Sequence, residues 1–285
     1  MLTYTKHTLV TLLLLAPLSS LNAANSAGKI DPEIAQNIDQ LMQATGLKHV
    51  IDSFPQEIEA QIKQQKINNS NAALSDEESR LLFSHFKSDT IYRDLKRHLN
   101  NKLDRKSLST LLKMHDEPLM KRIVAAEIAA SSPARQKEMT AFISELRHKA
   151  PSETRIKMIQ QLDRTSMSTE SVIYIMEMMM LGMNEMMLRR EGEGNDAKRR
   201  AQMQEVITNT TRLIEGELRQ QIIMSMHYIY RDFTDAEVMH YIEQLKRDEN
   251  QHYTRTAIEG IGIVILDAFK HGMNQLLQLR NAKAA

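Results

Sequence analysis

Cysteine and tryptophan are absent from this 285-residue chain, and glycine and proline are scarce, at nine and six residues. Without cysteine there is neither a disulfide bond nor a thiolate nucleophile, so burial of apolar surface must hold the fold together. The glycine-rich loops that cradle phosphates or dinucleotides and the G-x-S-x-G elbow of hydrolases are missing too. This composition favours an all-α protein and excludes several common enzyme classes.

The chain also lacks an excess of either charge, since it has 37 Lys and Arg residues and 36 Asp and Glu residues. An evenly mixed, nearly neutral chain gives no support for nucleic acid or an anionic membrane as the main partner. Beyond residue 23, no stretch reaches the roughly 20 apolar residues that a membrane-spanning helix needs. We therefore expect no transmembrane span in the mature protein.

The first 23 residues have the pattern of a secretory signal peptide. Lys6 is their only charged residue, an apolar run covers residues 9–18, and small residues lead to Ala23. The apolar run is too short to span a bilayer. We predict cleavage near Ala23, a mature chain that starts at Ala24, and location in the periplasm.

Apolar residues recur at helical spacing almost everywhere, and no segment alternates convincingly with a period of two. The prediction is an all-α helical bundle of about 8–10 helices. Helix starts are marked by Asp31-Pro32, by a capping box at Ser75-x-x-Glu78 and by another at Thr234-x-x-Glu237. Pro118 and the Ser131-Ser132-Pro133 segment mark interruptions.

The chain also contains two internal echoes, which indicate a duplicated helical unit. Aligning Gly46 with Gly182 places Leu47, Val50 and Ile51 on Met183, Met186 and Met187. A second echo pairs residues 103–112 with residues 233–242 at the same apolar offsets. We therefore predict a first helical unit at 24–132, connecting helices at 133–166 and a second unit at 167–285, with Ser168 as a helix N-cap.

Two motifs carry a resemblance to a family. They are Leu41-Met42-x-x-Thr45-Gly46 and Phe233-Thr234-x-x-Glu237-Val238-x-x-Tyr241. Together they resemble a family of exported, helical bacterial proteins of unknown function with a T-x-x-E-L-x-x-L-x-x-F-Y-x-S-P-x-G motif near the C-terminus. Asp116-Glu117-Pro118-Leu119 resembles the S-P part in the first unit, whereas Asp248-Glu249-Asn250 takes that place in the second. The resemblance covers about a third of the chain and implies a helical, periplasmic protein without implying an activity.

Methionine is abundant, with 19 residues, and seven of them lie between positions 176 and 187. Thioethers suit Cu(I), and Met176, Met179 and Met183 share one helix face, so a copper site is one interpretation. Apolar residues surround the helix, however, which is typical of a core helix or an adaptable binding groove. The predicted core or binding residues are Met176, Met179, Met180, Met183, Met186 and Met187.

A second metal hypothesis rests on the Glu-x-x-His motif, which helical di-iron sites use. Glu145 and His148 face away from the apolar stripe of their helix, whereas Glu249 and His252 continue the stripe of the preceding segment. No two histidines lie three or four positions apart, which removes the usual helical zinc spacing. Glu177, the only acid between residues 172 and 184, is interpreted as structural, paired with a cation or at a helix seam.

The function that these patterns favour is non-enzymatic. We expect an exported binding or interaction protein with an apolar, Met-rich surface for a hydrophobic ligand or a helical partner. We expect neither a cofactor nor a catalytic residue. A periplasmic copper- or iron-handling protein, a hydrolase with paired carboxylates and a homodimer formed through the Met face remain as alternatives.

Overall fold

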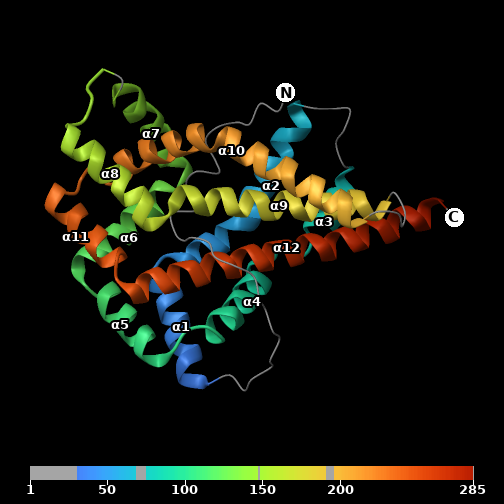
Figure 1. Cartoon of the computed structure of the whole chain (residues 1–285), viewed down its shortest axis with the longest axis horizontal. Coiled ribbons are helices and arrows are strands. Elements are labelled where there is room, and N and C mark those ends of the chain that lie inside the picture. The colour runs from blue at the N-terminus through green and yellow to red at the C-terminus, as the bar shows by residue number, and fades with distance from the viewer. Residues whose placement is uncertain (1–30, 69–74, 147, 191–195, 285) are drawn as a thin grey trace.

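The chain folds into helices packed on helices. The computed structural model describes residues 31–68, 75–146, 148–190 and 196–284, and all regular secondary structure in these ranges is α-helical (Figure 1). The all-α prediction is confirmed, with slightly more helices than expected because two-residue connections divide several segments. The helices are α1 (Pro32–Ala44), α2 (Leu47–Asn68), α3 (Asp76–Phe83), α4 (Ser88–Asn100), α5 (Arg105–His115), α6 (Pro118–Ala130), α7 (Pro133–Leu146), α8 (Glu153–Ser166), α9 (Ser168–Arg190), α10 (Asp196–Ile229), α11 (Asp235–Leu245) and α12 (Asp248–Ala284).

The helix starts read from the sequence are confirmed by their hydrogen bonds. Asp31 accepts from the backbone N–H of Glu33, and a proline follows it in the first turn of α1. The capping boxes at Ser75–Glu78 and Thr234–Glu237 are both formed, each with its two reciprocal bonds. Each cap satisfies amide groups that a helix start would otherwise leave without a partner.

The start of α9 differs from the prediction that Ser168 is its N-cap. Met167 adopts a left-handed conformation with φ of 54° and ends α8, and α9 begins at Ser168 itself. The carboxylate of Asp163, one turn back in α8, accepts from the backbone N–H of Thr169 at 3.1 Å and from its hydroxyl at 2.8 Å. A longer acidic side chain from the preceding helix therefore takes the capping role that the sequence assigned to a serine.

The three longest helices, α9, α10 and α12, run across the middle of the molecule (Figure 1). Helix α12 packs against α9, α4 and α3, and α10 packs against α9. The C-terminal helix therefore packs directly on the Met-rich helix. One hydrophobic cluster joins the helices on both sides of residue 133, so the two predicted units share a core; the division into units stays a prediction.

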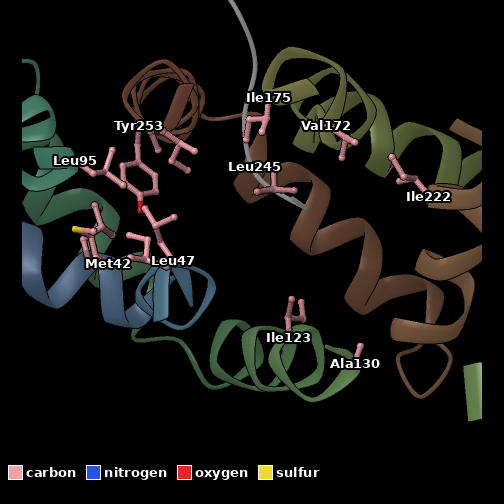
Figure 2. Close-up of a cluster of buried hydrophobic side chains, with 14 of the residues drawn as sticks. Met42, Leu47, Leu95, Ile123, Ala130, Val172, Ile175, Ile222, Leu245 and Tyr253 are labelled. Atoms are coloured by element: carbon pink, nitrogen blue, oxygen red, sulfur yellow. The ribbon is translucent and has the colours of Figure 1, made fainter. Parts of the chain in front are cut away.

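Figure 2 shows how this shared core is made. Met42, Leu47 and Leu95, from the N-terminal half, surround Tyr253 of α12. The Tyr253 ring is 1% exposed, and its hydroxyl lies 3.0 Å from the hydroxyl of Thr45, which is also buried. The phenol therefore enters the apolar core with its polar end satisfied, as burial of a tyrosine requires.

The two echoes of the sequence have different outcomes in the structure. Gly46 has a φ of 75° and separates α1 from α2, whereas Gly182 lies inside α9. Only the first position therefore needs the left-handed conformation that glycine adopts freely. In the second echo, by contrast, both segments form eleven-residue helices, α5 and α11, that begin directly after a capping residue.

Two expectations concern the membrane. The predicted signal peptide, residues 1–23 with cleavage near Ala23, lies outside the described residues. Among the helices that the structure does describe, none is long and apolar enough to cross a bilayer.

Candidate functional site

The Met-rich segment forms most of α9, and its four methionines whose side chains are described are neither fully covered nor fully exposed. Met176, Met179 and Met180 are half-buried, and so is Met178. Met176 and Met179 pack against the hydrophobic core. Met183, Met186 and Met187 belong to α9, but their side chains lie outside the described part of the structure. The described methionines thus line the boundary between core and surface.

Helix α10, which packs against α9, carries two strongly exposed apolar side chains. Leu213 is 85% exposed and Val206 is 55% exposed. Their spacing of seven residues places them on one face of α10, two turns apart. Met239 of α11, at 40%, is the remaining large apolar residue of this kind in the described ranges. We call Val206 and Leu213 the α10 ridge.

Glu177 lies at the seam between α9 and α10. It is half-buried, and its carboxylate accepts a 3.0 Å hydrogen bond from the hydroxyl of Thr211, which is 3% exposed. The sequence left open whether Glu177 pairs with a cation or lies at a helix seam, and the structure shows it at the seam.

A second polar group at the same seam centres on Arg219 of α10. Its guanidinium binds Asp163 at 2.6 Å, Glu170 at 2.8 Å and Glu215 at 3.0 Å. Asp163 is 1% exposed, and its burial raises the pKa of its carboxyl group despite the bonds from Thr169 and the charge of Arg219. Because a buried charge that loses its partner is costly, we assign Arg219 a role in holding α8, α9 and α10 together.

The Glu-x-x-His candidates do not converge in the structure. Glu145 and His148 are both exposed, as expected. His252 is exposed as well, with Nε2 3.1 Å from the carbonyl of Lys102, so the expectation that Glu249 and His252 continue the buried stripe is wrong. The stripe ends because α11 stops at Leu245 and a new helix begins at Asp248. Among the described residues, no group of three or more His, Cys, Asp or Glu side chains could hold a metal ion.

A half-buried acid that sequence analysis missed is Glu127 of α6. Its Oε1 accepts from the hydroxyl of Tyr230 at 2.6 Å and from that of Tyr241 at 3.1 Å. Burial raises the pKa of Glu127 to about 7, although both hydroxyl bonds act to lower it. Tyr230 and Tyr241 are 1% and 3% exposed. This group ties α6 to the end of α10 and to α11.

A further group missed from the sequence lines a pocket of about 370 Å³ where α1 meets α5 and the start of α6. The lining residues are Gln40, Ala44, Leu112, Lys113, His115, Asp116 and Lys121. His115 is 7% exposed, neither ring nitrogen has a hydrogen-bond partner, and burial lowers the pKa of the imidazole to about 4. Neither group has a local sequence signal, because each depends on helices that are distant in the chain.

Comparison with known proteins does not assign the chain to a family. No protein-family model, no curated protein and no solved structure matches the chain. The fold defines the class as an all-α protein with one shared core, and the resemblance to exported helical proteins stays a prediction.

Proposed function

We propose that this protein is an exported, non-enzymatic binding protein that receives an amphipathic partner helix on the exposed face of α10. The observation that carries the proposal is the α10 ridge, in which Leu213 is 85% and Val206 is 55% exposed on one helix face. Location in the periplasm is part of the proposal and rests on the signal-peptide pattern of residues 1–23.

The energetics favour a partner over bare solvent at the α10 ridge. Full burial of a leucine or valine side chain stabilises an assembly by about 1.5–3 kcal/mol. Two such residues seven positions apart match the repeat with which amphipathic helices pack in grooves and coiled coils.

The test uses a fluorescent amphipathic peptide about three heptads long with leucine at the a and d positions. Wild-type protein is expected to bind it, and the double variant Val206→Ser, Leu213→Ser is expected to bind at least about tenfold more weakly. Met239→Ser is the matched control, because it removes an exposed apolar side chain from a different helix, α11. Circular dichroism checks that all three proteins keep the same helicity.

Two outcomes would overturn the proposal. One is a wild-type protein that binds neither the peptide nor an apolar dye; the other is an α10-ridge variant that binds as tightly as wild type. Sedimentation analysis separates a homodimer from a heterologous partner, since a dimer through this ridge would dissociate in the double variant. Export is tested separately by N-terminal sequencing of protein from the periplasm: Ala24 is expected, and a retained Met1 contradicts it.

A further inference from the structure

Two histidines that are far apart in the chain meet at the surface between α3 and α12. His85 lies in the connection between α3 and α4, and His271 lies in α12. Their ring centres are 5.5 Å apart, and the ring planes are inclined by 37°. The absence of a helical His pair in the sequence therefore does not exclude a His pair in space.

The hydrogen bonds around the two rings leave a nitrogen atom of each imidazole without a protein partner. Nδ1 of His271 lies 2.8 Å from the backbone carbonyl of Asp267. Because a carbonyl only accepts, Nδ1 carries the proton, and Nε2 of the neutral ring keeps its lone pair. Histidines that bind metals usually fix their tautomer by such a bond to a carbonyl or carboxylate. Nε2 of His85 is buried and has no hydrogen-bond partner.

The backbone around the two rings is held in place from both sides. Next to His271, a Cβ atom on Gly272 would collide with the backbone carbonyl of Leu82, so the glycine lets α12 come directly against the end of α3. Next to His85, the ring of Phe86 is 2% exposed and packs edge-to-face on Phe269 of α12 at 4.9 Å. The two imidazoles are therefore presented by segments with little freedom to separate.

Ion pairs continue the same contact along α12. Arg280 binds Glu78 at 2.6 Å, and Lys283 binds Glu77 at 2.6 Å. The bond from Arg280 and the hydrogen bond from the backbone N–H of Ser75 lower the pKa of Glu78 to about 2. The ion pair between Glu78 and Arg280 therefore stays charged at neutral pH. The α3–α12 contact is thus fixed independently of the histidines.

We propose that His85 and His271 jointly bind a divalent transition-metal ion of the class that prefers imidazole, with Cu²⁺ bound more tightly than Ni²⁺ or Zn²⁺. With metal–nitrogen distances of about 2.0–2.1 Å, two imidazoles on one ion have ring centres roughly 5–6 Å apart, which matches the observed separation. The order of metals follows the general affinity series for nitrogen ligands. Water or an external ligand completes the coordination. This inference is independent of the α10 ridge.

The experiment titrates the chain, prepared without a polyhistidine tag, with Cu²⁺ alone and then with Ni²⁺ and Zn²⁺. We expect one equivalent of Cu²⁺ to bind, with at least about tenfold loss of affinity in His85→Gln and in His271→Gln. The double variant should lose much less affinity beyond either single variant than the first change costs, because each single change already breaks the chelate. Electron paramagnetic resonance of the Cu²⁺ complex should show two nitrogen ligands in wild type and fewer in the variants.

His148→Gln is the matched control, since His148 is exposed and belongs to the separate Glu145–His148 motif. It should bind Cu²⁺ like wild type. Because His271 is exposed on its helix, His271→Gln should fold normally, and Ni²⁺ should raise the melting temperature of wild type but not of this variant. Wild-type affinity in His271→Gln, or an equal loss in His148→Gln, would overturn the proposal.

Discussion

Helices α5 and α11 are two versions of one local design. Each has eleven residues, each starts directly after a capping residue, Asp104 or Thr234, and each is followed after two residues by another helix. In both helices the fourth, seventh and eleventh positions are buried. The same helix phase and cap therefore recur at the positions that the second sequence echo predicts.

The difference lies in what the buried positions carry. At the seventh position α5 has Leu111 and α11 has Tyr241, whose hydroxyl reaches Glu127. At the eleventh position α5 has His115, with both ring nitrogens unpaired, and α11 has Leu245. The shared pattern thus fixes where a side chain points, while the polar groups that could act chemically are specific to one of the two helices. Exchanging residues between α5 and α11 tests this separation.

The largest effect is expected for Leu245→His, which places at the eleventh position of α11 the histidine that α5 has there. Leu245 is 2% exposed, and an imidazole there would lose apolar packing and bury polar atoms. We expect a loss of about 3–4 kcal/mol in the free energy of unfolding, measured by urea denaturation. Leu245→Met, which conserves volume, should cost less than about 1.5 kcal/mol. A cost below about 1 kcal/mol for the histidine variant would mean that α11 already tolerates what α5 contains.

The next effect concerns the acid that Tyr241 contacts. Burial raises the pKa of Glu127 to about 7 from 4.5, so between these pH values the folded protein holds a proton that the unfolded chain has released. Stability from this group is therefore full below pH 4.5 and is lost as the pH rises to about 7, by at most about 3 kcal/mol.

The measurement is the stability difference between wild type and Glu127→Gln from pH 4 to 8. As the pH rises, wild type should lose stability relative to Glu127→Gln. Glu138→Gln is the control, because Glu138 also accepts from a tyrosine, Tyr228 at 2.9 Å, but its pKa is lowered by Arg135. For Glu138→Gln, wild type should instead gain stability relative to the variant as the pH rises. A flat profile for Glu127→Gln contradicts the prediction.

Much of the fold could be predicted because its signals are local. The caps at Asp31, Ser75 and Thr234 and the helix breaks at Pro118 and Pro133 each depend on a few consecutive residues, and each is observed. The failures come from signals that cross a helix end. Asp163 replaced the expected serine cap of α9, and the start of α12 reset the helix phase, which turned His252 outward.

The candidate sites were harder to predict, because their partners are brought together only by tertiary packing. His85 and His271 come from opposite parts of the chain, and so do Glu127 and Tyr241. A helical pattern gives the direction of each side chain within its own helix but does not say which helix lies opposite. The abundance of methionine in α9 was visible in the sequence, whereas the exposure of Leu213 required the structure.

A smaller effect is expected for His115→Leu, the reverse exchange. Burial lowers the pKa of His115 to about 4, so between pH 4 and 6.5 the unfolded chain binds a proton that the folded protein refuses. Wild type therefore loses stability as the pH falls through this range. The variant should be more stable by about 1 kcal/mol at pH 7 and by about 2 kcal/mol or more at pH 5.

Thermal unfolding at the two pH values provides the measurement. His227, whose pKa is also lowered to about 4 by burial, is present in both proteins and cancels in the difference. An equal gain at both pH values would mean that His115 titrates normally, and a loss of stability would mean that the imidazole has partners in solution.

The smallest effect tests whether the two caps are interchangeable. Asp104 accepts from the backbone N–H of Ser107 at 2.9 Å, and Thr234 accepts from that of Glu237 at 3.3 Å. Removing either oxygen, by Asp104→Ala or Thr234→Ala, should cost about 1 kcal/mol at pH 7. The exchanges Asp104→Thr and Thr234→Asp keep an acceptor in place and should each change stability by less than about 0.5 kcal/mol. Urea denaturation of the four variants distinguishes a shared capping design from a local coincidence: if Thr234→Asp costs as much as Thr234→Ala, the carboxylate is repelled by the neighbouring Glu237, and the caps of α5 and α11 are similar in position only.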